Sequence, residues 1–183
     1  HATGMGGMAF ENICAEGGFV AVMDFALPEL GNLMAGSVVN AGKDRMLNAG
    51  RAGIPQVVAP GCLDLIDFPG WQDIPARFSD RPFHEHNRLI KSSALNSEER
   101  RETAREIGTR LAQSKAPVHF LLPLRGVEEW DKENGPAHDP EGLAAFIDEV
   151  RRSVAPKVQT TEIDAHINDQ AFADKAMQVF DSW

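Results

Sequence analysis

The sequence predicts one α/β domain, built on an open, mostly parallel sheet with helices on both faces in a Rossmann-like three-layer arrangement. Five short segments rich in β-branched or large apolar residues alternate with helical patterns. Several of these segments are apolar on both faces, which is typical of buried parallel strands. The chain has 183 residues, of which 43% are hydrophobic, and this is enough for one sizeable core. We therefore expect residues 1–183 to form a single domain.

The predicted strands are bounded by Gly, Pro or Asp. They are residues 19–23, 54–59, 83–86, 118–122 and 158–163. Helical patterns lie between them: residues 7–16, 28–34, 44–52 and 97–114, and two helices that start after Asp139 and Asp169. Right-handed β-α-β connections join such elements most economically. The stretch 64–82 is predicted to be irregular, is too long for an ordinary connection, and is interpreted as a lid or a packing surface for another subunit.

The charge of the chain excludes some classes of partner. With 27 acidic and 18 basic residues the net charge is −9, which repels nucleic acids and anionic membrane surfaces. Arg100, Arg101 and Arg105 alternate with glutamates, and this pattern is typical of a solvated helix face. Cys14 and Cys62 lie far apart and match no metal or disulfide pattern. We expect a cytoplasmic protein without a membrane or nucleic-acid partner.

The sequence opens on a glycine-rich turn. Gly4 to Ala9 fits G-x-G-x-x-A, and Asp24 follows Gly4 after 20 residues, which is the layout of a dinucleotide fingerprint. In that fingerprint the glycines let the backbone approach a pyrophosphate, and the acid binds the ribose. Three interpretations stay open: a cradle for phosphate or another anion, a nicotinamide site, or a structural turn. A strand should precede the turn, so we expect an upstream segment.

Polar residues and glycines follow the predicted strands, at the sheet edge where ligands bind in such folds. These residues are Gly61, Asp64, His86, Asn87, Gly126, Asp164, His166, Asn168 and Asp169. His166 is predicted to be a general acid or base, with Asp64 or Asp164 orienting it or binding a divalent cation. Asp169 is also a natural N-cap for the last helix.

Other candidate groups allow more than one interpretation. His84 and His86 alternate along a strand and could ligate zinc with a third residue, although a hydrogen-bonded pair is the simpler interpretation, and we assign no metal site. Lys43, Arg45 and Arg125 could each neutralise a bound phosphate or carboxylate. No Walker loop and no nucleophile with an evident base is found in the sequence.

Several blocks occur together in one order: His1-Ala2-Thr3-Gly4-x-Gly6-Gly7, Pro60-Gly61-x-Leu63-Asp64, His86-Asn87, Gly126-Val127, Asp139-Pro140-Glu141 and His166-Ile167-Asn168-Asp169. They resemble an uncharacterised family that includes the amino-terminal region of the tomato protein giving resistance to tomato mosaic virus and that is often labelled ATP-binding. The resemblance implies the carboxy-terminal Rossmann-like half of a two-domain protein, with earlier strands supplied by the preceding segment.

Carried onto this chain, the resemblance implies a set of ligand-binding positions in addition to His166 and Asp64. They are Thr3, Gly4, Gly6, Gly7, Gly61, His86, Asn87, Gly126, Asn168 and Asp169. The chain departs from the family pattern in three places: Met5 and Met8 replace Thr and Arg, Ala94-Leu95-Asn96 replaces an Arg-Thr-Thr stretch, and Gln170 replaces Pro. The loss of two cations weakens the case for a phosphate in this member.

Three functions follow as hypotheses. The first is a domain that binds ATP, another nucleotide or another phosphorylated or carboxylated metabolite, with the N–H groups of Gly4 to Gly7 holding the anion. The second is a metal- or His-assisted enzyme acting on a small anionic substrate. The third is a protein-interaction domain with an exposed apolar patch at Phe68, Trp71 and Phe78, although a homo-oligomer contact explains the same residues more simply.

Overall fold

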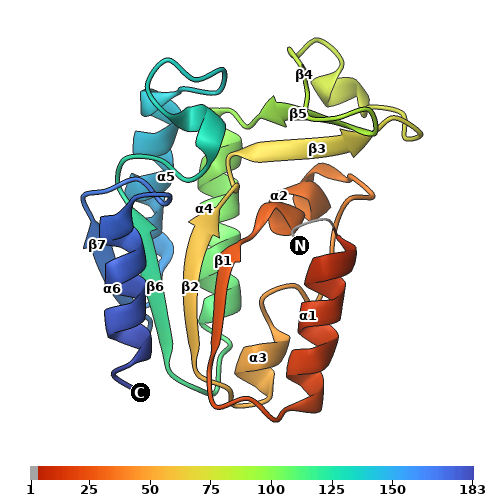
Figure 1. The fold of residues 1–183 in the computed structure, drawn as a ribbon. Helices are drawn as coiled ribbons and strands as arrows, with labels where there is room; N and C mark the ends of the chain where they lie inside the picture. The colour runs from red at the N-terminus through yellow and green to blue at the C-terminus, as the bar shows by residue number, and fades with distance from the viewer. Residues whose placement is uncertain (1–3) are drawn as a thin grey trace.

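The computed structural model describes residues 4–183 and is built around a four-stranded parallel sheet (Figure 1). The strands are β1 (Val22–Ala26), β2 (Gln56–Gly61), β6 (Val118–Pro123) and β7 (Gln159–Ile163), in the order β1-β2-β6-β7. All neighbouring strands of this sheet pair parallel, so their carboxyl ends lie along one edge. The predicted α/β fold is confirmed.

The two central strands are buried on both faces, as their apolar sequences predict. On one face, Val58 and Phe120 pack against the helices α4 (Ser97–Leu111) and α5 (Pro140–Ser153). On the other face, Val57 and Leu121 pack against α6 (Gln170–Phe180). Figure 1 shows α6 in front of the sheet and α4 behind it. The helices therefore cover both faces of the sheet.

Capping side chains define where α4 and α5 begin. In α4, the Asn96 side chain accepts hydrogen bonds from the backbone N–H groups of Glu98 and Glu99, and the Glu99 carboxylate accepts one from the backbone N–H of Asn96. In α5, Asp139 caps a helix that begins at Pro140. The remaining helices are α1 (Met5–Glu16), α2 (Pro28–Ala35) and α3 (Asn48–Arg51). The last of these is shorter than predicted, because residues 43–47 form turns.

A second, antiparallel sheet rises from the carboxyl edge of the first. It contains β3 (Leu65–Pro69), β5 (Ile90–Ala94) and β4 (His84–Glu85), in the order β3-β5-β4. The prediction that residues 64–82 are irregular was wrong in part, because β3 and a short 3-10 helix, η1 (Ala76–Phe78), lie within them. The predicted strand at 83–86 does not join the parallel sheet.

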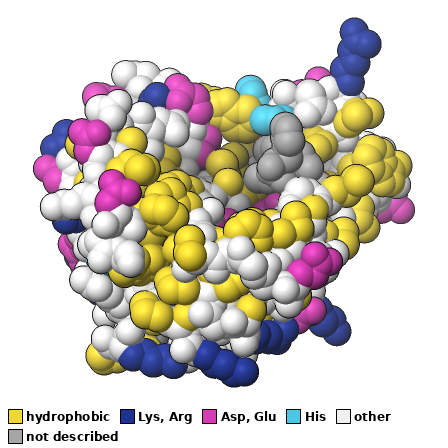
Figure 2. All heavy atoms as spheres, turned by 60° about the horizontal axis from the view of Figure 1, so that its bottom comes forward, with side chains coloured by type: hydrophobic (Ala, Val, Ile, Leu, Met, Phe, Trp, Pro, Cys, Tyr) yellow, Lys and Arg dark blue, Asp and Glu magenta, His cyan; other side chains and the backbone are white. Residues whose placement is uncertain are grey.

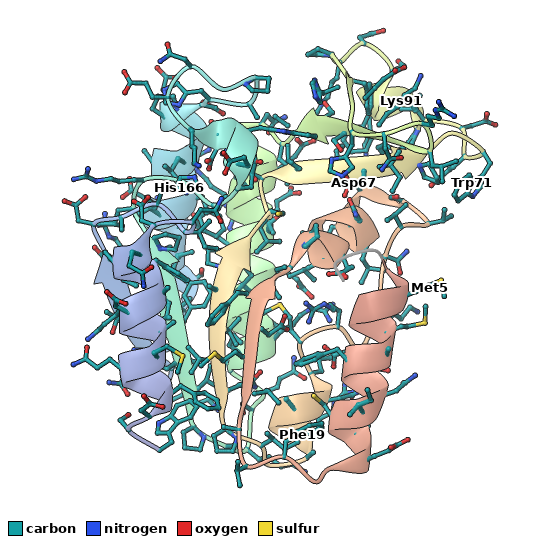
Figure 3. All side chains as sticks on the ribbon, in the orientation of Figure 1. Met5, Phe19, Asp67, Trp71, Lys91 and His166 are labelled. Carbon is teal, nitrogen blue, oxygen red and sulfur yellow. The ribbon has the colours of Figure 1, made fainter. Side chains whose placement is uncertain are left out.

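The small sheet has its own core, and this overturns the predicted apolar patch. Phe68 and Phe78 are each 1% exposed and their rings pack together, so the described surface cannot present them to a partner. Trp71 alone of the three is exposed, and it points away from the molecule at the end of this sheet (Figure 3). In the part of the chain that the structure describes, no helix combines the length and the apolar character that crossing a bilayer requires.

Candidate functional site

A cavity of about 460 Å³ opens where β1, β2 and β6 end. Its apolar wall includes the rings of Phe25 and Phe172, which meet edge to face at 5.7 Å. Its polar wall includes Glu128 and Asn168. A volume of several hundred Å³ is in the range of small-molecule sites, and the carboxyl edge is where parallel sheets bind ligands. We call this space the edge cavity.

His166 lies beside the edge cavity, in the turn between β7 and α6 (Figure 3). Its Nε2 lies 2.9 Å from Asp131 Oδ1 and 2.9 Å from the carbonyl oxygen of Glu128. Its Nδ1 accepts the backbone N–H of Asn168 over 3.1 Å. Because Nδ1 is an acceptor, Nε2 carries the hydrogen and donates it to Asp131 and to the carbonyl. Both ring nitrogens are therefore engaged within the protein.

The residues around His166 hold it in this position by close packing and hydrogen bonds. Gly126 has a φ of 133°, and a Cβ there would collide with the Asp131 carboxylate and the His166 ring. Asp131 also accepts the backbone N–H of Val127 over 2.5 Å. Asp169 precedes α6 but does not cap it, because its Oδ2 accepts the N–H of His166 over 2.8 Å. The predicted capping bond of Asp169 is thus replaced by one that closes the turn.

Two buried carboxyls lie behind this turn. Asp64 is 3% exposed, and its Oδ2 lies 3.9 Å from Arg100 Nη1. Glu128 is 6% exposed and its Oε2 accepts the N–H of Trp130 over 2.6 Å. Burial is the main cause that raises the pKa of Asp64 to about 7 and that of Glu128 to about 8. Both groups therefore hold a proton more readily than ordinary carboxyls.

The interpretation of Arg100 as part of a solvated helix face was wrong. Arg100 is 2% exposed, and its guanidinium lies between Asp64 and Asp139. Its position is the signal that could have revealed this, because Arg100 stands four residues before Ala104, on the apolar stripe of α4. Glu128 and Asp131 were not predicted as site residues, because they lie several residues beyond the end of the strand that precedes them.

The glycine-rich turn opens on a different cavity, of about 280 Å³, lined by Gly6, Gly7, Asp24, Glu29 and Arg45. The two cavities adjoin, since Phe25 and Ala26 line both. Gly4 precedes α1 and its φ is 75°. Thr3 lies outside the described residues.

Arg45 at the base of this second cavity was predicted to be able to neutralise a phosphate, and the structure contradicts this. Its guanidinium is 2% exposed and donates to the carboxylates of Glu11, Asp24 and Glu29 and to the carbonyl of Ala26. These bonds use all five N–H donors of an arginine. Asp24, the candidate ribose ligand, is therefore paired with Arg45. The carboxylate of Glu29 also lies close to Gly7, where a phosphate would have to sit.

The remaining predicted positions divide between the edge cavity and the small sheet. Gly61 lines the edge cavity, and a Cβ there would strike the backbone of Phe25. His86 is exposed. Its ring lies 5.2 Å from that of Trp130, which directly follows the cavity-lining residue Glu129. Asn87 forms the hairpin turn, accepting the N–H groups of Leu89 and Ile90. Among residues 4–183 no three His, Cys, Asp or Glu side chains gather as they would around a metal ion.

The comparison with known proteins decides the family. The profile of the UPF0261 C-terminal domain, an uncharacterised protein family, matches residues 1–183. The chain belongs to the UPF0261 family. A UPF0261 protein of Brucella melitensis is 53% identical over 183 residues, and one of Mesorhizobium japonicum is 36% identical over 182 residues. The resemblance drawn from the sequence blocks is thereby confirmed.

This UPF0261 domain is shorter than its relatives. It covers 44% of the Brucella protein and 46% of the Mesorhizobium protein, so the chain spans less than half of the length of these relatives. The tomato protein "ToMV resistance protein Tm-1(GCR237)" is 30% identical over 183 residues, which are 24% of its length. In these relatives the domain is one part of a longer protein.

Proposed function

We propose that this UPF0261 domain binds a small metabolite that carries a ring and an anionic group, with nucleotides as the class to test, in the edge cavity. The single observation that carries the proposal is the coincidence of this cavity with the uncapped amino-terminal end of α6. The ring would occupy the apolar part of the cavity and the anion the end of the helix.

The apolar part favours a ring. Phe25, Val127, Ile167 and Phe172 contribute to the wall, and aromatic side chains pack well against planar ligands. Asn168 supplies a polar group at the rim, where its Nδ2 donates to Glu129 over 3.0 Å. A carboxamide can both donate and accept hydrogen bonds, which suits the edge of a nucleobase.

The end of α6 favours the anion. The first N–H groups of a helix have no partner inside the helix, and the helix dipole is positive there. The Asp169 side chain does not cap these groups, because it bonds to His166. The N–H groups of Phe172 and Ala173 donate to the carbonyl oxygen of Asp169, which leaves those of Gln170 and Ala171 for an anion, next to the cavity-lining Phe172. We therefore place the anionic group at α6, instead of at the glycine-rich turn, where Arg45 and Glu29 leave it no partner.

The prediction that His166 is a catalytic acid or base stays a prediction. Its two ring nitrogens are engaged by Asp131, the Glu128 carbonyl and the Asn168 N–H, which supports a positioning role instead. In this role His166 holds Asn168 and Glu128 at the wall of the cavity. Contacts with the remainder of a longer protein belong to the same proposal and rest on the longer relatives alone. The homo-oligomer stays a prediction from the sequence.

Isothermal titration with ATP, AMP and adenosine tests the proposal, with two matched variants. Ala173→Trp places an indole at the mouth of the edge cavity, on an exposed position of α6. Ala144→Trp makes the same change on an exposed position of α5, where no cavity is lined. We expect the first to abolish binding and the second to leave it unchanged. The proposal fails if none of the three compounds binds, or if both variants bind them equally well.

A further inference from the structure

The outer face of α1 is apolar, which is unusual for a helix at the surface of a domain. Seven positions of α1 are exposed, and five of them carry apolar side chains. The seven are Met5, Met8, Ala9, Asn12, Ile13, Ala15 and Glu16. By contrast, the exposed positions of α4 are all polar, namely Glu98, Glu102, Arg105 and Thr109. Water is therefore a poor partner for this face of α1.

The inner face of α1 shows the reverse pattern. Its buried residues are Gly7, Glu11 and Cys14. Glu11 pairs with Arg45 over 3.3 Å and accepts the backbone N–H groups of Met46 and Asn48. The helix is thus attached to the domain largely by polar contacts, while most of its larger apolar side chains point outward. A helix with apolar residues on its outer side normally lies between two surfaces.

The apolar surface continues beyond the end of the helix. Phe19 and Val20, in the segment between α1 and β1, are 46% and 91% exposed. In Figure 3, Met5 lies at one end of α1 and Phe19 near the other. Residues 5–20 contain five of the ten large hydrophobic side chains that are exposed in the described part of the chain. Such a concentration is typical of an interaction surface. We call Met5, Met8, Ile13, Phe19 and Val20 the α1 face.

The longer relatives indicate which partner covers the α1 face. The matching profile is that of a C-terminal domain, and the match covers 44% of the Brucella protein, so more than half of that protein lies outside the domain. His1 is four residues from Met5, and an extended chain spans at most about 3.6 Å per residue, so a preceding segment would join within about 14 Å of Met5. A part tethered this closely has a high effective concentration at the α1 face, which a second copy in dilute solution lacks.

We propose that the α1 face is the docking surface for the part of the longer protein that precedes this domain, and that this part covers it with apolar side chains. α1 contains no Lys or Arg, which disfavours a nucleic acid or an anionic membrane as the occupant. The inference is independent of the ligand proposed above, because no residue of the α1 face lines the edge cavity.

Methionine oxidation in the complete protein tests the proposal. Hydrogen peroxide converts accessible methionines to the sulfoxide, and mass spectrometry measures the rate at each position. Met177 on α6 is the matched reference, since it is 49% exposed in this domain, against 79% for Met5 and 45% for Met8. If the α1 face is covered, Met5 and Met8 should oxidise at least about tenfold more slowly than Met177. Rates at Met5 and Met8 that equal or exceed the rate at Met177 would overturn the proposal.

Two variants of the complete protein show whether the apolar side chains cause this protection. Met8→Glu combined with Ile13→Glu places two carboxylates on exposed positions of the α1 face, and Met177→Glu makes the same change on α6. The double variant should restore fast oxidation of Met5 and leave the rate at Met177 unchanged, whereas Met177→Glu should leave Met5 protected. Protection of Met5 that persists in the double variant would overturn the proposal. Protection that is lost on about a hundredfold dilution of the wild type would identify a second copy as the occupant and overturn it as well.

Discussion

His166 Nε2 lies 2.9 Å from Asp131 Oδ1, and this hydrogen bond joins the turn before α6 to the short 3-10 helix η2 (Glu129–Asp131). Both side chains are buried, with 5% and 7% exposed. Hydrophobic side chains are spread over the middle of the face in Figure 2, whereas Lys and Arg lie at its margins. The bond between His166 and Asp131 holds together the two segments that carry Asn168 and Glu128 to the edge cavity.

Replacement of Gly126 by alanine should be the most damaging change at this bond. Its φ of 133° strains any other residue, and the added Cβ would collide with Asp131 and His166. We expect a loss of at least about 3 kcal/mol in the free energy of unfolding, measured in urea. Gly36→Ala is the control, because Gly36 also has a positive φ, of 82°, in the left-handed region but faces open space, and it should cost about 1 kcal/mol. Equal losses would show that the collision does not matter.

A double-mutant cycle should measure the coupling of His166 and Asp131. His166→Ala and Asp131→Ala each leave a buried polar partner without its bond, so each should cost about 2 kcal/mol or more. The double variant should lose less than the sum, with a coupling of about 1–3 kcal/mol from urea unfolding. Additive losses would mean that the two side chains act independently, and His166 would then have no positioning role through Asp131.

The parallel sheet could be predicted because its two central strands have continuous apolar sequences. Val57 and Val58 in β2, and Phe120 and Leu121 in β6, are apolar at consecutive positions, and only a strand covered on both faces needs this. The small sheet was missed because β3 contains Asp67 and β5 contains Ser92, which the strand pattern does not favour. Their side chains bond to each other over 2.5 Å, and only the three-dimensional structure shows this.

The candidate site could be predicted in part, because the ends of parallel strands meet. Gly61, Gly126 and His166 were chosen for that reason, and the structure brings them around the edge cavity and the His166 turn. The glycine-rich turn misled the prediction, because a sequence pattern cannot show that Arg45 uses four donors on carboxylates of α1, β1 and α2 and the fifth on the Ala26 carbonyl.

Arg45→Met should destabilise the domain strongly. The variant would leave Glu11, Asp24 and Glu29 buried together without their shared cation, and removing one partner of a buried ion pair typically costs about 3–5 kcal/mol. Arg51→Met is the matched control, since Arg51 pairs with Asp44 at the surface, and it should cost less than about 1 kcal/mol. Thermal unfolding at low and high salt measures both. Similar losses for the two variants would mean that the Arg45 cluster contributes no more than a surface pair.

The pH dependence of stability should reveal the proton on Glu128. Burial raises its pKa from 4.5 to about 8, so between these values the folded protein keeps a proton that the unfolded chain releases. The free energy of unfolding should therefore fall as pH rises from about 5 to 8 and level off above that range. Asp64, with a pKa raised from 3.8 to about 7, adds a fall of the same sign at lower pH.

Glu128→Gln should remove the part of this fall that belongs to Glu128. The stability of the variant relative to wild type should then rise between pH 5 and pH 8, by up to about 1.4 kcal/mol for each pH unit. Urea unfolding at pH 5, 6.5, 8 and 9 measures the difference, and Glu129→Gln should keep the profile of the wild type. Because glutamine has nearly the shape of a protonated glutamate, a relative stability that stays constant from pH 5 to pH 9 would mean that Glu128 is ionised throughout this range.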